Sequence, residues 1–269
     1  MKPVLVLTVA ILAVGIVVFI WKAAYRPEPV YNGKTLTQWA EQFGSNNWTG
    51  GTESAKEAKV AIQKIGTNSV PFLIDLIRST ESPIRTKLRQ VVPRSWHARL
   101  HLRERTQHTR RTGAHGLAAL GPDAAATALP DLIEIASHHP NGDARYVAMF
   151  GIRVLGDGAE PAIPFLIQSL TNSVNIIRDD AALALGYMHL QPDVTVPALT
   201  AYLNSITGKG GWELEDAIES LGQFGTNATP AVPLLLRLLN HSDATVRSQV
   251  TNALGRIDPA GDWTHRASP

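Results

Sequence analysis

The side chains with the greatest chemical potential in this sequence gather in residues 94–111, the stretch RSWHARLHLRERTQHTRR. The stretch holds six arginines and three histidines against a single acid, Glu104. Clustered guanidinium groups can bind phosphates or acidic surfaces, and they can also form a solvated helix face. His97 and His101 stand four residues apart, as two metal ligands on one helix face do, but a zincin helix needs Glu where Ala98 stands. The two histidines therefore do not match a zincin helix.

Four functions of this stretch stay open. The arginines can form a solvated outer face, dock onto an acidic partner or anionic lipid headgroups, bind nucleic acid, or hold a metal together with the histidines. Residues 85–111 carry nine Lys or Arg and one acid, whereas the other residues carry sixteen bases and twenty-two acids. The positive charge is therefore a local patch, and we favour the solvated face. We define the basic patch as Arg94, Arg99, Arg103 and Arg105.

No other motif predicts catalysis. The chain has no cysteine, which excludes disulfides, thiolate metal sites and a cysteine nucleophile. It also lacks the G-x-S-x-G elbow, the P-loop and the G-x-G-x-x-G loop. We therefore predict no catalytic residue, no cofactor and no bound metal. One helix is expected to carry an acidic face, which we interpret as solvated, formed by Glu213, Glu215, Asp216 and Glu219.

Residues 1–26 form the most apolar segment of the chain. The run from Pro3 to Trp21 is interrupted only by Thr8, and as a helix it would span about 28 Å, close to the hydrocarbon thickness of a bilayer. Trp21 and Lys22 suit the membrane interface. We therefore expect an uncleaved transmembrane anchor, with a cleaved signal peptide as the alternative, and the rest of the chain outside the cytoplasm.

The rest of the chain repeats one pattern. An apolar segment with proline at its second position occurs five times, and segments rich in Ala, Leu and Gly lie between these occurrences. Each unit is expected to be two helices joined by a tight turn, with proline in the first turn of the second helix, where a missing N–H costs no hydrogen bond. The prolines are Pro71, Pro130, Pro164, Pro197 and Pro233, separated by 59, 34, 33 and 36 residues.

An arginine begins the first helix of several units. Arg145, Arg178 and Arg247 each stand eight residues before the same position of the Ala-Leu-Gly segment, and Arg111 lies one period before Arg145. Each follows acids or turn residues. We expect these four to be structural arginines that bridge neighbouring repeats by pairing with turn acids and carbonyls.

The units and their flanks divide the chain into four parts. Thr35 and Gln38 form a capping-box pattern that predicts an N-terminal cap helix from Thr35 to Phe43, and Ser54 with Glu57 predicts the start of the next helix. The first proline separation exceeds one period by about 25 residues. The parts are an anchor at 1–26, a linker and cap helix at 27–54, a repeat domain at 55–260 with a basic insert at about 84–109, and a tail at 261–269.

By these motifs the chain resembles HEAT-like repeat proteins, including the short repeats of the bilin (PBS) lyases. More closely, residues 30–260 are similar to bacterial HEAT-repeat-domain proteins common in the Verrucomicrobia, which follow an anchor or signal with Tyr-x-Gly-Lys-Thr/Ser-Leu-x-x-Trp. Here that motif runs from Tyr31 to Trp39, with further matches at Ile65–Asn68 and Ala253–Pro259. Hydroxylases of this class carry His-Glu metal pairs, and the sequence has no His-Glu dipeptide. The resemblance implies a bacterial inner-membrane protein with a periplasmic repeat domain.

The predicted fold class is an all-α, right-handed solenoid of five to six HEAT-like helix pairs, preceded by one transmembrane helix. The predicted function is a non-enzymatic, membrane-tethered scaffold whose concave groove, lined by second helices, binds a protein partner. The alternatives are a bilin-lyase-like enzyme and a binder of nucleic acid or anionic surfaces, of which nucleic-acid binding is disfavoured. Candidate partner-binding residues are Asp75, Arg78, Asp131, Glu134, Gln168, Tyr202 and Arg237.

Overall fold

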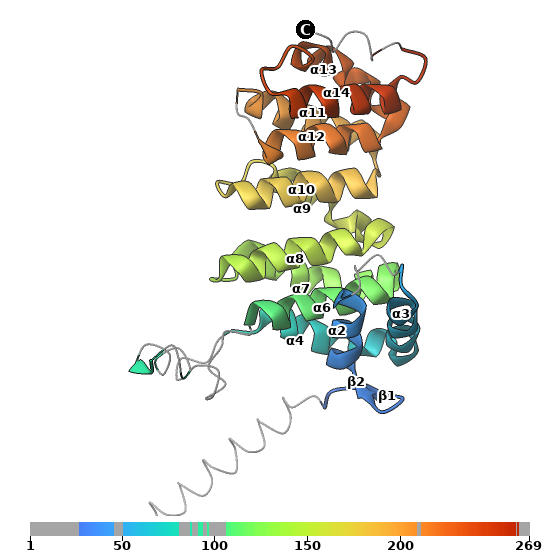
Figure 1. The fold of residues 1–269 in the computed structure, drawn as a ribbon, viewed down its shortest axis with the longest axis vertical. Helices are drawn as coiled ribbons and strands as arrows, with labels where there is room; N and C mark the ends of the chain where they lie inside the picture. The colour runs from blue at the N-terminus through green and yellow to red at the C-terminus, as the bar shows by residue number, and fades with distance from the viewer. Residues whose placement is uncertain are drawn as a thin grey trace, which may run out of the picture.

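The computed structural model of the chain is a stack of helices (Figure 1). It describes residues 27–45, 51–80, 87, 91–93, 96, 106–208, 211–261 and 263. The N-terminal elements are β1 (Val30–Tyr31), β2 (Lys34–Thr35), α2 (Leu36–Ser45), α3 (Glu53–Ile65), the 3-10 turn η1 (Thr67–Ser69) and α4 (Val70–Arg78). The repeat helices that follow are α6 (Thr106–Leu120), α7 (Ala125–His138), α8 (Gly142–Val154), α9 (Ile163–Ser169), α10 (Asn175–Met188), α11 (Pro192–Ile206), α12 (Trp212–Gln223), α13 (Val232–Leu238) and α14 (Ala244–Ile257). The 3-10 turns η3 (Gly121–Ala124), η4 (Gly156–Ala162) and η5 (Gly225–Ala231) join first helices to second helices.

The helices form two layers. The first helices, α6, α8, α10, α12 and α14, each pack on the next along the stack, and the second helices are α4, α7, α9, α11 and α13. Each second helix packs closely on the first helix of the following unit, which gives five pairs among the described residues: α4 with α6, α7 with α8, α9 with α10, α11 with α12, and α13 with α14. One hydrophobic core runs through the described stack, as expected of repeats that bury their faces against neighbours.

The first helices approach each other through small residues. A Cβ added to Gly186 on α10 would lie 2.6 Å from the Cα of Ser220 on α12, and one added to Gly222 on α12 would lie 3.2 Å from the Cα of Ala253 on α14. Residues without bulky side chains therefore set the spacing of this layer. The Ala-Leu-Gly segments of the sequence are the interface between repeats.

The N-terminal end is covered by α2 and α3, which both pack on α6. The predicted capping box is confirmed: Thr35 N–H donates to Gln38 Oε1 at 2.9 Å, and Gln38 N–H donates to Thr35 Oγ1 at 3.3 Å. The β1–β2 hairpin is an addition to the predicted all-α class. Trp39 Nε1 donates to the carbonyl of Tyr31 at 2.9 Å, so the two ends of the Tyr-to-Trp motif hold the hairpin on α2.

The second predicted cap is wrong by two residues, and the correct one offers a test. Helix α3 begins at Glu53, and the side chain of Thr52 accepts from Ala55 N–H at 3.2 Å. Replacing Thr52 with Ala is expected to lower the free energy of unfolding by about 1 kcal/mol, because it removes an N-cap acceptor. Chemical denaturation measures the change, with Ser54→Ala as the control that should leave stability within about 0.5 kcal/mol; equal losses would contradict this assignment.

The proline prediction is confirmed for three second helices and wrong for two. Pro71, Pro164 and Pro233 lie in the first turns of α4, α9 and α13. Pro130 and Pro197 lie inside α7 and α11, because these two helices begin five residues before the proline. The sequence period therefore marks the repeats but not the helix starts.

The predicted fold class needs a correction. No helix among the described residues is long and apolar enough to cross a membrane. The longest of them, α6 and α11, have 15 residues, so they extend about 22 Å, and the hydrocarbon core is about 30 Å thick. The predicted anchor at 1–26 lies outside the described residues. The described residues form an all-helical repeat stack with one short hairpin, and they contain no transmembrane helix.

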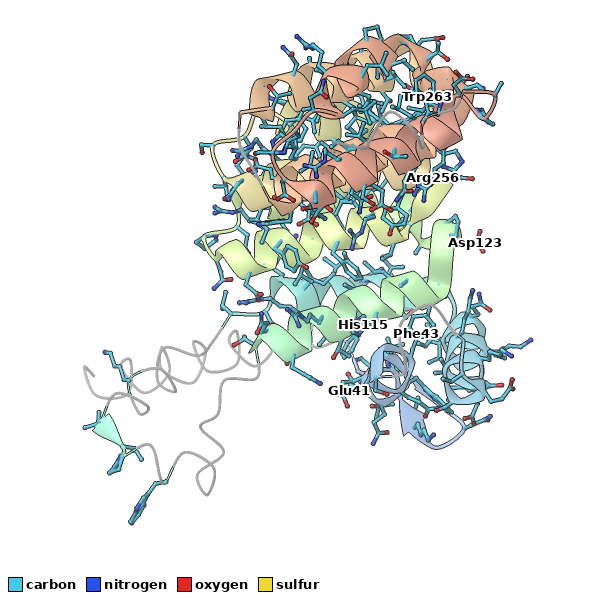
Figure 2. The ribbon with its side chains drawn as sticks, turned by 45° about the horizontal axis from the view of Figure 1, so that its top comes forward. Glu41, Phe43, His115, Asp123, Arg256 and Trp263 are labelled. Carbon is cyan, nitrogen blue, oxygen red and sulfur yellow. The ribbon has the colours of Figure 1, made fainter. Side chains whose placement is uncertain are left out.

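The two ends of the stack differ from its middle. Figure 2 places Glu41, Phe43 and His115 where α2 meets α6, and Trp263 at the opposite end beside α14. Trp263 Nε1 donates to the carbonyl of Asp258 at 2.9 Å. The outward side of α14 is polar, with exposed Ser248, Asn252 and Arg256. A polar outer face on the last helix is typical of a capping repeat that ends a solenoid.

Candidate functional site

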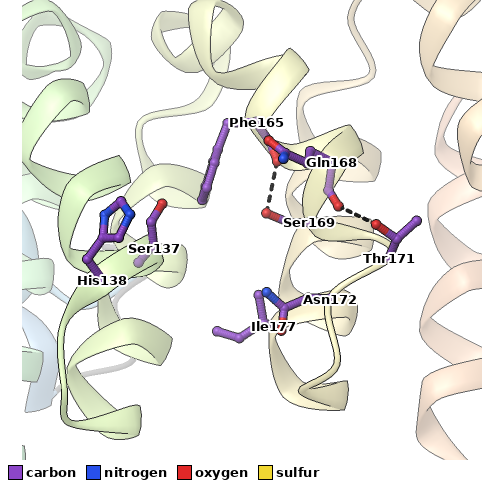
Figure 3. Close-up of a pocket in the computed structure, with 9 residues that line it drawn as sticks. Ser137, His138, Phe165, Gln168, Ser169, Thr171, Asn172 and Ile177 are labelled. Atoms are coloured by element: carbon purple, nitrogen blue, oxygen red, sulfur yellow. Dashed lines mark hydrogen bonds between the residues drawn. The ribbon is translucent and has the colours of Figure 1, made fainter.

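Three hollows follow one another along the second helices. The first lies between α7 and α9 and has a volume of about 410 Å³. Figure 3 shows Ser137 and His138 on one side of it and Phe165, Gln168 and Asn172 on the other. The side chains of Ser169 and Thr171 donate to the carbonyls of Phe165 and Gln168, so the hydroxyl groups are used within the hollow's own wall. The wall of this hollow therefore combines polar groups with the aromatic ring of Phe165.

The second hollow lies between α9 and α11, with a volume of about 500 Å³. It shares Thr171 and Asn172 with the first hollow. Arg178 and Tyr202 lie in its wall together with apolar side chains. The first two hollows therefore adjoin each other.

The third hollow lies between α11 and the η5–α13 segment and is the largest of the three, about 720 Å³. It shares Ala201 with the second hollow. Its wall is mostly apolar, and the guanidinium of Arg237 donates to Asn204 at 3.0 Å across it. The lining residues are Pro197, Thr200, Ala201, Asn204, Pro230, Pro233, Leu234 and Arg237.

The structure places the candidate partner-binding residues in three different settings. Gln168 lines the first hollow and Arg237 the third. Arg78 is bonded to Asp131 at 2.7 Å and to Glu134 at 3.2 Å. This exposed ion-pair group joins α4 to α7, and such pairs contribute little to stability. Asp75 is exposed on α4.

Tyr202 lines the second hollow with little of its surface exposed. Its side chain is buried, and its hydroxyl lies 3.0 Å from Asp179 Oδ1 and 3.2 Å from Glu213 Oε1. The hydroxyl of Tyr202 on α11 thus contacts both α10 and α12. Burial raises the pKa of the phenol, and the Asp179 carboxyl beside it acts in the same direction. Tyr202 therefore supports the hollow from beneath.

The repeat arginines bond to the turns between units. The Nη1 atoms of Arg145, Arg178 and Arg247 donate to the carbonyls of residues six positions earlier, His139, Asn172 and His241. Arg178 also pairs with Glu213 of the next unit. The three side chains thus connect the start of each first helix to the preceding turn.

In the unit before these, Arg110 takes the place predicted for Arg111. Arg110 is 3% exposed. Its Nε and Nη2 donate to the carbonyl of Ser79, and Nη1 donates to Asp143 at 2.7 Å. Arg111 is exposed. The prediction fails by one residue because Arg110 and Arg145 are separated by 35 residues, whereas Arg145 and Arg178 are separated by 33.

Two other sequence predictions concern charged groups. The basic patch, Arg94, Arg99, Arg103 and Arg105, lies outside the described residues. The acidic face on α12 is less solvated than predicted, because the side chain of Glu213 is 12% exposed and Asp216 is half-buried. Among the described residues, no group of three or more His, Asp or Glu side chains is arranged to hold a metal ion.

The family comparisons agree with the repeat pattern. A model described as HEAT repeat matches residues 231–259, and a model described as PBS lyase HEAT-like repeat matches residues 214–241. Both matches support a HEAT repeat protein. They fall on α12, η5, α13 and α14. No curated protein matches the chain.

Solved structures with some likeness include two crystal structures of engineered proteins from the Northeast Structural Genomics Consortium. The first is 17% identical, with 84% of this chain and 97% of that chain covered and a TM-score of 0.49. The second is also 17% identical, with 86% of this chain and 60% of that chain covered and a TM-score of 0.47. The match thus spans less than two thirds of the second protein's length.

Proposed function

We propose that the protein is a non-enzymatic scaffold whose second-helix face binds a protein partner. The observation that carries this proposal is that the three hollows adjoin one another along the second helices, since neighbouring hollows share Thr171, Asn172 and Ala201. A row of hollows across successive repeats suits an extended segment that contacts several units at once. Solenoid repeats provide such long surfaces, each contributing a few contacts.

The side chains that line the hollows indicate what kind of segment would bind there. The third hollow has an apolar wall, and Arg237 at its rim donates to the neutral Asn204. Because a guanidinium forms its strongest hydrogen bonds with carboxylates, a bound segment gains most by placing an acidic side chain there. The first hollow offers exposed amides at Gln168 and Asn172, which can bond to a bound backbone. We therefore expect an apolar segment with an acidic residue.

Ala201 is the most informative position to change. It is exposed and lies in the wall of both the second and third hollows. Replacing it with Trp should fill part of both and weaken partner binding at least 10-fold, because the lost contacts lie at the centre of the surface. The probe is a peptide selected from a displayed random library against the whole chain, and its affinity is measured by calorimetry.

The matched control is Ser248→Trp, which adds the same ring to the exposed side of α14, away from the hollows. The control should bind the peptide as the unmodified protein does. Equal affinity of the Ala201→Trp variant and the unmodified protein would show that the peptide binds elsewhere and would contradict the proposed face.

A further inference from the structure

A cluster of carboxyl groups lies where α10 meets α12. Asp179 and Asp180 on α10 are 2% and 5% exposed, and each has a buried Oδ2 atom that has no hydrogen-bond partner among the described residues. Asp216 on α12 faces them. Burying a carboxylate without a partner is costly, so such a group holds its proton to higher pH. The carboxyl groups at this junction therefore retain their protons to higher pH than exposed carboxyl groups do.

The hydroxyl of Tyr202 shows where one proton resides. It has a single hydrogen, yet it lies within hydrogen-bond distance of Asp179 Oδ1 and Glu213 Oε1. Both contacts are hydrogen bonds only when one of the two carboxyl groups supplies its own proton. Arg178 bonds to Glu213 through Nε at 3.0 Å and through Nη2. The paired guanidinium stabilises the ionised form of Glu213, so of the two groups Asp179 is the one that carries the proton below its pKa.

The ionised form of Asp180 is stabilised by fewer neighbours than that of Asp179, which has the Tyr202 hydroxyl and Arg178 beside it. The groups that face it are Arg153 from α8, Asp179 on its own helix and Asp216 from α12. The guanidinium of Arg153 lies over the rings of Phe150 and Tyr187, at 5.0 and 5.4 Å from their centres. Burial raises the pKa of Asp180 to about 7, and the two neighbouring acids add to the effect of burial.

Asp179 and Asp216 shift in the same direction. Burial raises the pKa of Asp179 to about 6, and the charges of Glu213 and Asp216 contribute in the same direction. The hydrogen bond that the ionised carboxyl accepts from Tyr202 and the charge of Arg178 lower it. Burial raises the pKa of Asp216 to about 6, with Glu219 and Glu215 on its own helix adding to it and Arg153 opposing it. Burial and the neighbouring acids therefore raise the pKa of all three groups above that of an exposed aspartate.

The two helices have a fixed contact beyond the cluster. Gly186, less than two turns after Asp180, lies against the backbone of Ser220, with no room for a Cβ between them. We propose that the α10–α12 junction is a pH-sensitive hinge, closed while Asp179, Asp180 and Asp216 hold their protons and loosened at the N-terminal ends of both helices when they release them. Because each repeat in a stack contacts only the repeats next to it, one junction can loosen while the others stay closed.

The direction of the pH effect follows from the raised pKa values. The folded junction keeps protons that the unfolded chain releases near pH 4, so from about pH 4 to pH 7 the folded state binds more protons. The free energy of unfolding therefore falls as the pH rises through this window, and the contribution is fully present below it. The hinge is a property of the junction itself and does not depend on partner binding. Arg178 and Tyr202 also line the second hollow, so the hinge lies directly beneath that surface.

The experiment compares thermal unfolding at pH 5 and pH 8 for the full chain and for Asp180→Asn, which mimics the protonated acid. The unmodified protein should melt about 5 °C or more lower at pH 8 than at pH 5. The variant should lose much of this difference and melt above the unmodified protein at pH 8. Asp75→Asn, an exposed acid on α4, is the control and should keep the full difference.

A second measurement needs no variant. Carbon-13 NMR of aspartate carboxyl groups in the unmodified protein should show three of them titrating near pH 6–7, and amide exchange in the first turns of α10 and α12, corrected for intrinsic rates, should quicken above pH 7. All aspartates titrating below pH 5, or an Asp180→Asn variant with an unchanged pH difference, would overturn the hinge.

Discussion

Replacing Arg110 with Met is expected to lower the free energy of unfolding by about 3 kcal/mol or more, because removal of one partner from a buried ion pair strands the other. The guanidinium makes hydrogen bonds to Asp143 and to the carbonyl of Ser79, so its loss leaves that carbonyl without its donor and the carboxylate of Asp143 with the amide of Gln107 but without its opposite charge. Met keeps most of the apolar stem, and the loss therefore reports the guanidinium. Urea unfolding measures it.

Arg111→Met is the matched control, because Arg111 is the next residue of α6 but is exposed. Its free energy of unfolding should stay within about 0.5 kcal/mol of the unmodified protein. A larger loss from Arg111→Met than from Arg110→Met would restore the sequence-based assignment of the structural arginine and contradict the geometry described above.

A second large effect is expected at the close approach between first helices. Gly186→Ala should lower the free energy of unfolding by about 1–3 kcal/mol through overpacking, because the new Cβ would lie 2.6 Å from the backbone of Ser220. This loss should appear although Ala is the better helix former by about 1 kcal/mol. Calorimetry or chemical denaturation at the same pH measures it.

Gly255 provides the comparison, since it also follows Ala-Leu but lies on α14, which ends the stack. A Cβ at Gly255 would meet nothing within 4 Å. Gly255→Ala should therefore raise the free energy of unfolding by about 0.5–1 kcal/mol. If both variants gain stability, the first helices are farther apart than the structure places them.

The sequence predicted the repeats well because their cause is local. The Ala-Leu-Gly segments mark the contacts between first helices, and the Thr35–Gln38 box marks the start of α2, since in each case neighbouring residues decide the structure. The helix starts around Pro130 and Pro197 were missed because turns of different length precede the second helices. A period in sequence does not measure the length of these turns.

The functional surface was less accessible to the sequence. The choice of second helices led to Gln168, Tyr202 and Arg237, which line hollows. The contacts of the Tyr202 hydroxyl could not be predicted, because they depend on packing between three helices. The buried acids did leave a signal. Asp180 stands two residues after Arg178, as Val147 stands two residues after Arg145, and Val147 is buried in the core. An acid at a position of the repeat that is otherwise in the core indicates a buried carboxyl group.

Site-specific cross-linking in the cell of origin tests whether the second-helix face binds a protein. A photo-reactive amino acid is placed at Ala201 between the second and third hollows, and in a separate variant at Ser248 on the outer side of α14. We expect a discrete adduct with one protein from the Ala201 position, which an excess of the selected peptide removes, and no adduct with that protein from the Ser248 position. The same adduct from both positions, or from Ser248 alone, would contradict this expectation.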